Sequence, residues 1–210
     1  MDTNCIQTPL LLTSYLFEYP SAEWWEGVPT HAAAVADVER PQSREVFEEF
    51  FGYIGESDRQ EFEDAYVRAF DFSQNTNLYL TTHNRTDFGK QSEEMLAYKQ
   101  LFLDAGYDLN HELPDYLPLV LEFAALVDRA KGRAALQAYR PSLELLRLSL
   151  KDGNLPHYGL LHSICGTLPG VSPETQEQVQ QMAGYGPPVE TVGLSGYADP
   201  RIAQANPNNP

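Results

Sequence analysis

The side chains most able to bind a metal or act as nucleophiles are the histidines and cysteines. They are His31, His83, His111, His157 and His162, with Cys5 and Cys165. His162 and Cys165 lie three residues apart and could share one face of a helix, whereas His157 would lie on a poorly matched face. A zinc site would need further ligands from elsewhere in the chain. A surface histidine beside a buried, inert cysteine is the more common arrangement, and we favour it.

No motif for nucleotide or acyl-transfer chemistry is present in the sequence. There is no phosphate-binding Gly-x-x-x-x-Gly-Lys loop, no dinucleotide fingerprint, no Gly-x-Ser-x-Gly elbow and no His-Glu-x-x-His pair. Acidic pairs occur at Glu48-Glu49, Glu63-Asp64 and Glu93-Glu94, but adjacent residues on a helix point in different directions. These pairs therefore indicate a solvated surface rather than a general acid and base. The residues and motifs therefore give no positive argument for an enzyme.

The charge balance narrows the choice of partners. The 210 residues include 30 Asp and Glu against 14 Lys and Arg, which gives a net charge of -16. Such a chain repels nucleic-acid backbones and anionic membrane surfaces, so we expect neither as a partner. A basic partner is favoured. Two cysteines are too few for a disulfide framework and are compatible with a reducing compartment.

No export signal or membrane span is visible in the sequence. No Lys or Arg precedes Arg40, whereas a signal peptide needs a positively charged start. The longest apolar region, residues 113–127, contains Asp115, Pro118 and Glu122 and is too short and too charged to span a bilayer.

Helical periodicity runs through almost the whole chain. A first helix carries an apolar face that includes Leu12 and Leu16 and is ended by Tyr19-Pro20. We expect Trp24-Trp25 in a connector, with Thr30 as the N-cap of an Ala-rich helix to about residue 39. Pro41 can occupy the first position of the next helix, and Ser57-Asp58-Arg59-Gln60 resembles a capping box for the one that follows.

The second half of the chain predicts a central helix flanked by amphipathic ones. A polar loop with one helical turn covers residues 71–85, and a helix follows to about residue 105, with Gly106 as its stop. Asp115 is the predicted N-cap of a helix that is apolar on all sides except at Glu122, which places it at the centre of the domain. Residues 133–151 should form a helix kinked or split at Pro141.

These elements predict an all-α fold, a compact bundle of roughly eight to ten helices joined by short connections. The helical domain is expected to cover residues 1–183, with helices beginning near Asn154 and at Ser172-Pro173 in its last part. From residue 184 the composition changes to Gly, Pro, Ala and Asn. We expect residues 184–210 to form a flexible C-terminal tail.

The middle of the chain resembles the NarJ-like assembly chaperones of nitrate reductase, a branch of the TorD/DmsD group of redox-enzyme maturation proteins. The resemblance covers roughly residues 60–127 and rests on Tyr66-Val67-Arg68-Ala69-Phe70-Asp71, Leu78-Tyr79-Leu80, His83, Met95-Leu96, Glu112-Leu113-Pro114-Asp115-Tyr116-Leu117-Pro118 and Leu121-Glu122-Phe123. Its most specific element is Glu112-Leu113-Pro114-Asp115-Tyr116, because the family signature is Glu, two residues that include Pro, then Asp and His or Tyr. The arginines that usually follow the histidine are missing here, while Asp87 is retained.

The resemblance implies a TorD-like helical bundle that works as a non-catalytic chaperone in the cytoplasm. Its partner would be the N-terminal segment of the catalytic subunit of a molybdopterin-containing oxidoreductase, either a nitrate reductase or a relative in the same superfamily. The chaperone would hold that subunit for insertion of the molybdenum cofactor and the iron–sulfur cluster, and would delay docking or export. It would contain no tightly bound cofactor itself.

The client-binding residues implied by the resemblance are Asp71, His83, Asp87, Glu112, Pro114, Asp115, Tyr116 and Glu122. A basic, amphipathic segment would bind as a helix in an apolar groove, with acidic groups on the rim orienting its cations. Structural roles remain open: Asp115 as a helix cap, Tyr116 in the core and His83 as a hydrogen-bonded loop anchor. Glu122 must find a partner if it is buried.

Two other functions remain open on the sequence alone. One is a metal-dependent hydrolase on a helical scaffold that uses His83, Asp87 and His111, which a tightly held stoichiometric metal would support. The other is an adaptor unrelated to molybdenum enzymes. Neighbouring genes for a molybdopterin subunit and an iron–sulfur subunit are expected only for the chaperone.

Overall fold

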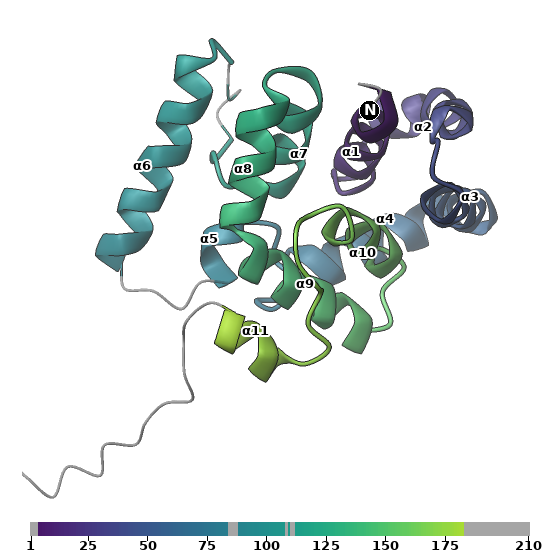
Figure 1. Ribbon diagram of the computed structural model, residues 1–210. Coiled ribbons are helices and arrows are strands. Elements are labelled where there is room, and N and C mark those ends of the chain that lie inside the picture. The colour runs from purple at the N-terminus through teal and green to yellow at the C-terminus, as the bar shows by residue number, and fades with distance from the viewer. Residues whose placement is uncertain (1–3, 84–87, 108, 110–111, 183–210) are drawn as a thin grey trace, which may run out of the picture.

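The computed structural model describes residues 4–83, 88–107, 109 and 112–182 as a bundle of helices (Figure 1). The helices are α1 (Asn4–Leu16), α2 (Ala22–Ala34), η1 (Val35–Asp37, a 3-10 turn), α3 (Pro41–Glu56), α4 (Arg59–Phe70), α5 (Leu80–His83), α6 (Phe88–Asp104), α7 (Leu117–Leu126), α8 (Arg129–Ala138), α9 (Arg140–Asp152), α10 (Tyr158–Cys165) and α11 (Gln176–Met182). Within these ranges the only extended pairing is a bridge between Tyr79 and Tyr116. The all-α prediction is confirmed, while the expected tail at residues 184–210 lies outside the described residues.

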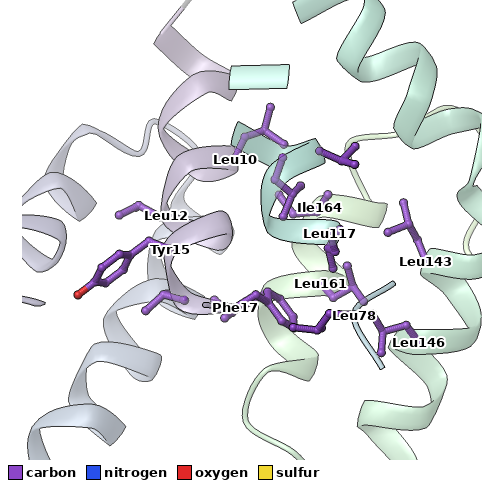
Figure 2. Close-up of a cluster of buried hydrophobic side chains, with 14 of the residues drawn as sticks. Leu10, Leu12, Tyr15, Phe17, Leu78, Leu117, Leu143, Leu146, Leu161 and Ile164 are labelled. Carbon is purple, nitrogen blue, oxygen red and sulfur yellow. The ribbon is translucent and has the colours of Figure 1, made fainter. Parts of the chain in front are cut away.

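Helix α7 lies between α1 and α8, in the central position that its sequence predicts. Its side chains are buried from Leu117 to Leu121 and at Phe123 and Ala124, so neighbouring elements cover every face of this part of the helix. Ser14 of α1 donates a hydrogen bond of 2.7 Å to the carbonyl of Pro118 and fixes the two helices together. Figure 2 shows side chains from α1, α7, α9 and α10 meeting in the same core, among them Leu10, Leu117 and Leu161.

Several predicted helix boundaries are confirmed and others are wrong. Pro41 opens α3, and Gly106, with φ of +69°, ends the turn after α6. The segment expected to split near Pro141 does so at Tyr139, between α8 and α9. The last two helices begin later than predicted: α10 starts at Tyr158 and α11 at Gln176, after turns that the sequence patterns do not resolve.

The Trp24-Trp25 pair belongs to a helix and not to a connector. Ser21 is the N-cap of α2, and its hydroxyl accepts the backbone N–H of Trp24 at 3.2 Å. Thr30, expected to cap a later helix, therefore lies inside α2. A capping serine one turn upstream of the aromatic pair provides a sufficient start signal. In the same way Asp58, rather than Ser57, caps α4 by accepting from Gln60 N and Glu61 N.

The close approach of α7 and α8 depends on Gly132. A Cβ atom at this position would lie 2.3 Å from the Cα atom of Ala124. We therefore predict that Gly132→Ala lowers the free energy of unfolding by about 1–3 kcal/mol, because the helices must move apart. Gly52→Ala in α3 is the matched control, since a Cβ there meets no atom within 4 Å. It should raise stability by up to about 1 kcal/mol. Urea unfolding of both variants tests this, and equal effects would contradict it.

Among the residues that the structure describes, no helix has the length and apolar character needed to cross a bilayer.

Candidate functional site

A groove of about 730 Å³ lies between α6 and the segment that leads from α6 to α7. It is lined by Met95, Leu96, Lys99, Leu103, Gly106, Tyr107, Leu109, Glu112, Leu113 and Pro114. Three of its leucines are strongly exposed: Leu96 at 66%, Leu103 at 55% and Leu113 at 49%. Large apolar side chains gathered at one concave surface are typical of a binding site for another molecule.

Helix α6 forms one wall because it is apolar on two faces. On the core face, the ring of Phe102 packs against Phe123 with centroids 4.6 Å apart, and Tyr98 packs against Tyr139 at 4.5 Å. On the groove face, Met95, Lys99 and Leu103 follow one another at intervals of four residues. Figure 1 shows α6 at the edge of the bundle, so one apolar face packs inward while the other lines the groove.

Carboxylates lie beside this groove. Glu112 lines it directly and is exposed. The half-buried Glu122 of α7 lies close to Tyr107, and burial together with the interaction with Glu122 raises the pKa of Tyr107. Glu18, just after α1, is exposed at the surface, but protein atoms surround part of its carboxylate. This partial burial, and to a smaller extent repulsion from Glu122, raises the pKa of Glu18 to about 7. A cation that approaches two mutually repelling carboxylates stabilises their charged forms.

Asp115 is buried and caps a helix, but not the helix expected from the sequence. Its Oδ2 atom accepts the backbone N–H of Thr81 at 3.1 Å and the Thr81 hydroxyl at 2.6 Å, at the start of α5. Helix α7 begins at Leu117, and its N-cap residue Tyr116 makes no side-chain capping bond. The segment before α7 is held instead by backbone pairing, since Leu117 N donates to the carbonyl of Leu78 at 2.9 Å.

We predict that Asp115→Ala lowers the free energy of unfolding by about 1–3 kcal/mol, because it leaves the buried polar groups of Thr81 without this acceptor. A double-mutant cycle with Thr81→Val separates this bond from other effects. The double variant should lose less stability than the sum of the single variants, and strict additivity would contradict the assignment. If Asp115 also contacts the client, peptide affinity will fall in a variant that remains folded.

The remaining predicted site residues fall into different places. Glu112 and Pro114 line the groove, whereas Asp71 and Tyr116 line a separate pocket of about 210 Å³. The ring of His83 is hydrogen-bonded through Nε2 to the carbonyl of Asn77 at 2.7 Å, which fits the loop-anchor role. Burial lowers the pKa of His83, so it is neutral at pH 7. Asp87 lies outside the described residues.

Part of the groove wall was not among the site residues predicted from the sequence. Met95 is half-exposed and lines the groove with Leu96 and Leu103. A signal was present, because apolar residues in α6 occupy more than one helical face. Glu18 carried no such signal, since only the fold brings it next to Glu122.

The histidines and cysteine considered for zinc do not form a site. His157 is buried among aromatic rings, with centroids 4.8 Å from both Phe50 and Phe70. His162 is exposed and stacks on Tyr158, and Cys165 is buried, as the sequence indicated. Over the described part of the chain, no group of three or more His, Cys, Asp or Glu side chains is arranged to hold a metal ion.

His157 makes stability depend on pH. Burial lowers its pKa from 6.5 to about 3. In the unfolded chain His157 is protonated below about pH 6.5, whereas in the folded chain it stays neutral down to about pH 3. The free energy of unfolding must therefore fall as the pH drops between these two values. At pH 5 the loss should be about 2 kcal/mol. We predict that His157→Phe removes this loss. Urea unfolding at pH 7.5 and pH 5 tests it, and unchanged pH dependence in the variant would contradict it.

Comparisons with known proteins agree on one family. The family model described as the nitrate reductase delta subunit matches residues 37–162. The chain is 30% identical over 172 residues to the probable nitrate reductase molybdenum cofactor assembly chaperone NarJ of Bacillus subtilis (strain 168), covering 81% of this chain and 94% of that protein. It is 24% identical over 177 residues to the chaperone NarJ of Escherichia coli (strain K12), covering 83% and 75%.

A third relative is much longer. The nitrate reductase-like protein NarX of Mycobacterium tuberculosis (strain ATCC 25618 / H37Rv) is 37% identical over 103 residues. This match covers 49% of this chain and only 16% of NarX. The two NarJ proteins, by contrast, match over most of both chains.

Proposed function

This chain belongs to the nitrate reductase delta subunit family, and from that premise we propose that it is a system-specific assembly chaperone for a molybdenum oxidoreductase. The proposed partner is the N-terminal segment of the catalytic subunit. The chaperone holds this subunit in the cytoplasm until the molybdenum cofactor and iron–sulfur cluster are inserted, and only then permits docking or export. It performs no catalysis and keeps no cofactor of its own.

The observation that carries the proposal is the apolar groove beside α6. Its exposed leucines offer surface that gains free energy when apolar side chains cover it, at about 25 cal/mol per Å². Glu112 adds negative charge on its wall, and Glu122 acts on Tyr107, another residue of the wall. A segment with an apolar stripe and basic residues complements both features, and a helix lying in a groove is a common mode of peptide recognition.

Apolar contacts and charge pairs should contribute differently to the affinity and to the rate of association. Exposed charge pairs are screened over about 10 Å at 0.1 M salt and are individually worth less than about 1 kcal/mol. Most of the affinity must then come from apolar burial, while the net charge of -16 attracts the basic segment and raises the association rate. The hydrolase alternative has no such support, because the NarJ relatives are assembly chaperones.

Calorimetry with peptides copied from the first residues of the molybdopterin-containing catalytic subunit proposed as the client tests the proposal. One peptide keeps the native sequence, a second has its apolar positions changed to Ser, and a third has its basic positions changed to Gln. We expect the Ser peptide to lose most affinity. The Gln peptide should bind more weakly and lose its dependence on salt. Equal binding of the Ser and native peptides would rule out the groove.

A further inference from the structure

A second pocket, of about 210 Å³, is lined mainly by tyrosines. We call it the tyrosine box, and its walls are Tyr19, Tyr66, Tyr79, Tyr116, Phe70, Leu78 and Asp71. The rings of Tyr19 and Tyr66 meet nearly at right angles, with centroids 5.7 Å apart. Those of Tyr79 and Tyr116 are 5.3 Å apart at an angle of 37°. The box thus presents aromatic surfaces in several orientations, with one carboxylate among them.

The walls of the box are held in place by hydrogen bonds. Tyr66 donates from its hydroxyl to the carbonyl of Phe17 at 2.8 Å. The backbones carrying Tyr79 and Tyr116 are joined, because Leu80 N donates to the carbonyl of Asp115 at 3.0 Å and Leu117 N to that of Leu78. Pre-organised rings lose little conformational entropy when a ligand binds between them.

The electrostatic character of the box favours a cation. None of the residues that line it is basic, and Asp71 is exposed. Burial raises the pKa of Tyr66 and of Tyr116, and Glu18 adds to the effect at both. The phenols therefore stay neutral at pH 7 and keep the electron-rich ring faces that attract cations. Glu112 links the two sites, because it lines the groove and also acts electrostatically on Tyr79 and Tyr116.

We propose that the tyrosine box receives one Lys or Arg side chain of the client segment whose apolar stripe occupies the groove, with the rings of Tyr19, Tyr79 and Tyr116 around the cation and Asp71 as its counter-ion. This assignment rests on the proposed function and deepens it. The groove selects an apolar stripe, and the box selects a cation at one fixed position relative to that stripe. A client with the same apolar residues but a displaced cation would then bind more weakly.

The test is a coupling measurement between box variants and peptide variants. Each basic residue of the client peptide is replaced in turn by norleucine, which keeps most of the aliphatic chain and removes the charge. Tyr79→Leu and Tyr19→Leu remove one ring each, while Tyr79→Phe keeps the ring and loses only the hydroxyl. We expect each Leu variant to bind the native peptide about threefold to tenfold more weakly. Tyr79→Phe should bind nearly as well as the wild type.

The decisive result is selectivity for one peptide position. Norleucine at that position should remove the difference between wild type and Tyr79→Leu, whereas norleucine elsewhere should preserve it. Asp71→Asn should show the same coupling. If Tyr79→Leu lowers the affinity for all peptides equally, or for none, the box does not bind a cation of the peptide and the inference is wrong. The proposed function would stand in that case provided that the native peptide still binds and the Ser peptide does not. A native peptide that fails to bind the wild type overturns both.

Discussion

Replacing Glu144 by alanine is expected to lower the free energy of unfolding by about 3–5 kcal/mol, the largest effect of any single substitution considered for this chain. Glu144 lies in α9 with 0% of its surface exposed, between two arginines that are almost as deeply buried. Its Oε2 atom accepts from Arg147 Nε at 2.6 Å, and its Oε1 atom accepts from Arg140 at 3.2 Å. Removing the carboxylate would leave two cations in a low-dielectric interior without their counter-ion.

This network also attaches the segment between α10 and α11 to α9. Ser172 donates to Glu144 Oε1 at 2.7 Å, and the two arginines donate to the carbonyls of Pro169, Gly170 and Pro173. Loss of Glu144 should therefore release this segment as well as destabilise α9. Since domains of this kind are commonly stable by only about 5–15 kcal/mol, the variant should lose a large share of its free energy of unfolding.

Urea unfolding monitored by circular dichroism measures the loss directly. Ser172→Ala is the matched control, because it removes one hydrogen bond to the same carboxylate and should cost only about 1 kcal/mol. A triple variant in which Arg140, Glu144 and Arg147 all become apolar should recover much of the stability, since no unpaired charge remains. A Glu144→Ala protein as stable as Ser172→Ala would show that the buried ion pairs contribute little.

The second large effect concerns binding rather than stability. Leu96→Asp places a carboxylate on the groove wall at a position that is 66% exposed, so the fold should be unaffected. We expect affinity for the native client peptide to fall by about 30-fold to 100-fold. The variant loses apolar contact area and would have to desolvate a charge against an apolar stripe.

Val171→Asp is the control for the added charge. Val171 is 89% exposed, lies between α10 and α11 and does not line the groove. It should bind the peptide like the wild type, and both variants should keep the wild-type unfolding midpoint. Equal affinities of Leu96→Asp and wild type would place the client segment elsewhere on the molecule.

Elements whose signals are local could be predicted from the sequence. Pro41 and Gly106 mark the start of α3 and the end of α6 by backbone constraints that do not depend on the rest of the chain. The nearly uninterrupted apolar run of α7 predicts its central position, because only a helix surrounded by neighbours can bury all its faces.

Contacts between residues that are far apart in the sequence could not be predicted from local sequence patterns. Asp115 before an apolar helix has the pattern of a local cap, but its partner Thr81 is 34 residues away. Arg140, Glu144 and Arg147 have the spacing of solvent-exposed helix pairs, and only the chain segment that covers α9 makes them buried.

The candidate site was predicted in part. Glu112 and Pro114 came from the family resemblance and lie at the groove, whereas Leu96 and Leu103 had to be found from their exposure in the fold. The tyrosine box combines Tyr19, just after α1, with residues of α4 and of two loops. The family resemblance named Asp71 and Tyr116 as client-binding residues, but no sequence spacing relates them to Tyr19, so the tertiary structure is needed to place them around one pocket.

If the proposed function is right, insertion of the molybdenum cofactor into the client requires this chain. The most direct test is the molybdenum content, per mole of protein, of the catalytic subunit purified from cells that lack this chain. The same measurement is made in cells that carry either the wild type or Leu96→Asp. We predict a subunit largely without molybdenum in the deletion strain, full content with the wild type and little recovery with Leu96→Asp. A catalytic subunit fully loaded with molybdenum in the absence of this chain would show that the chain is not needed for cofactor insertion.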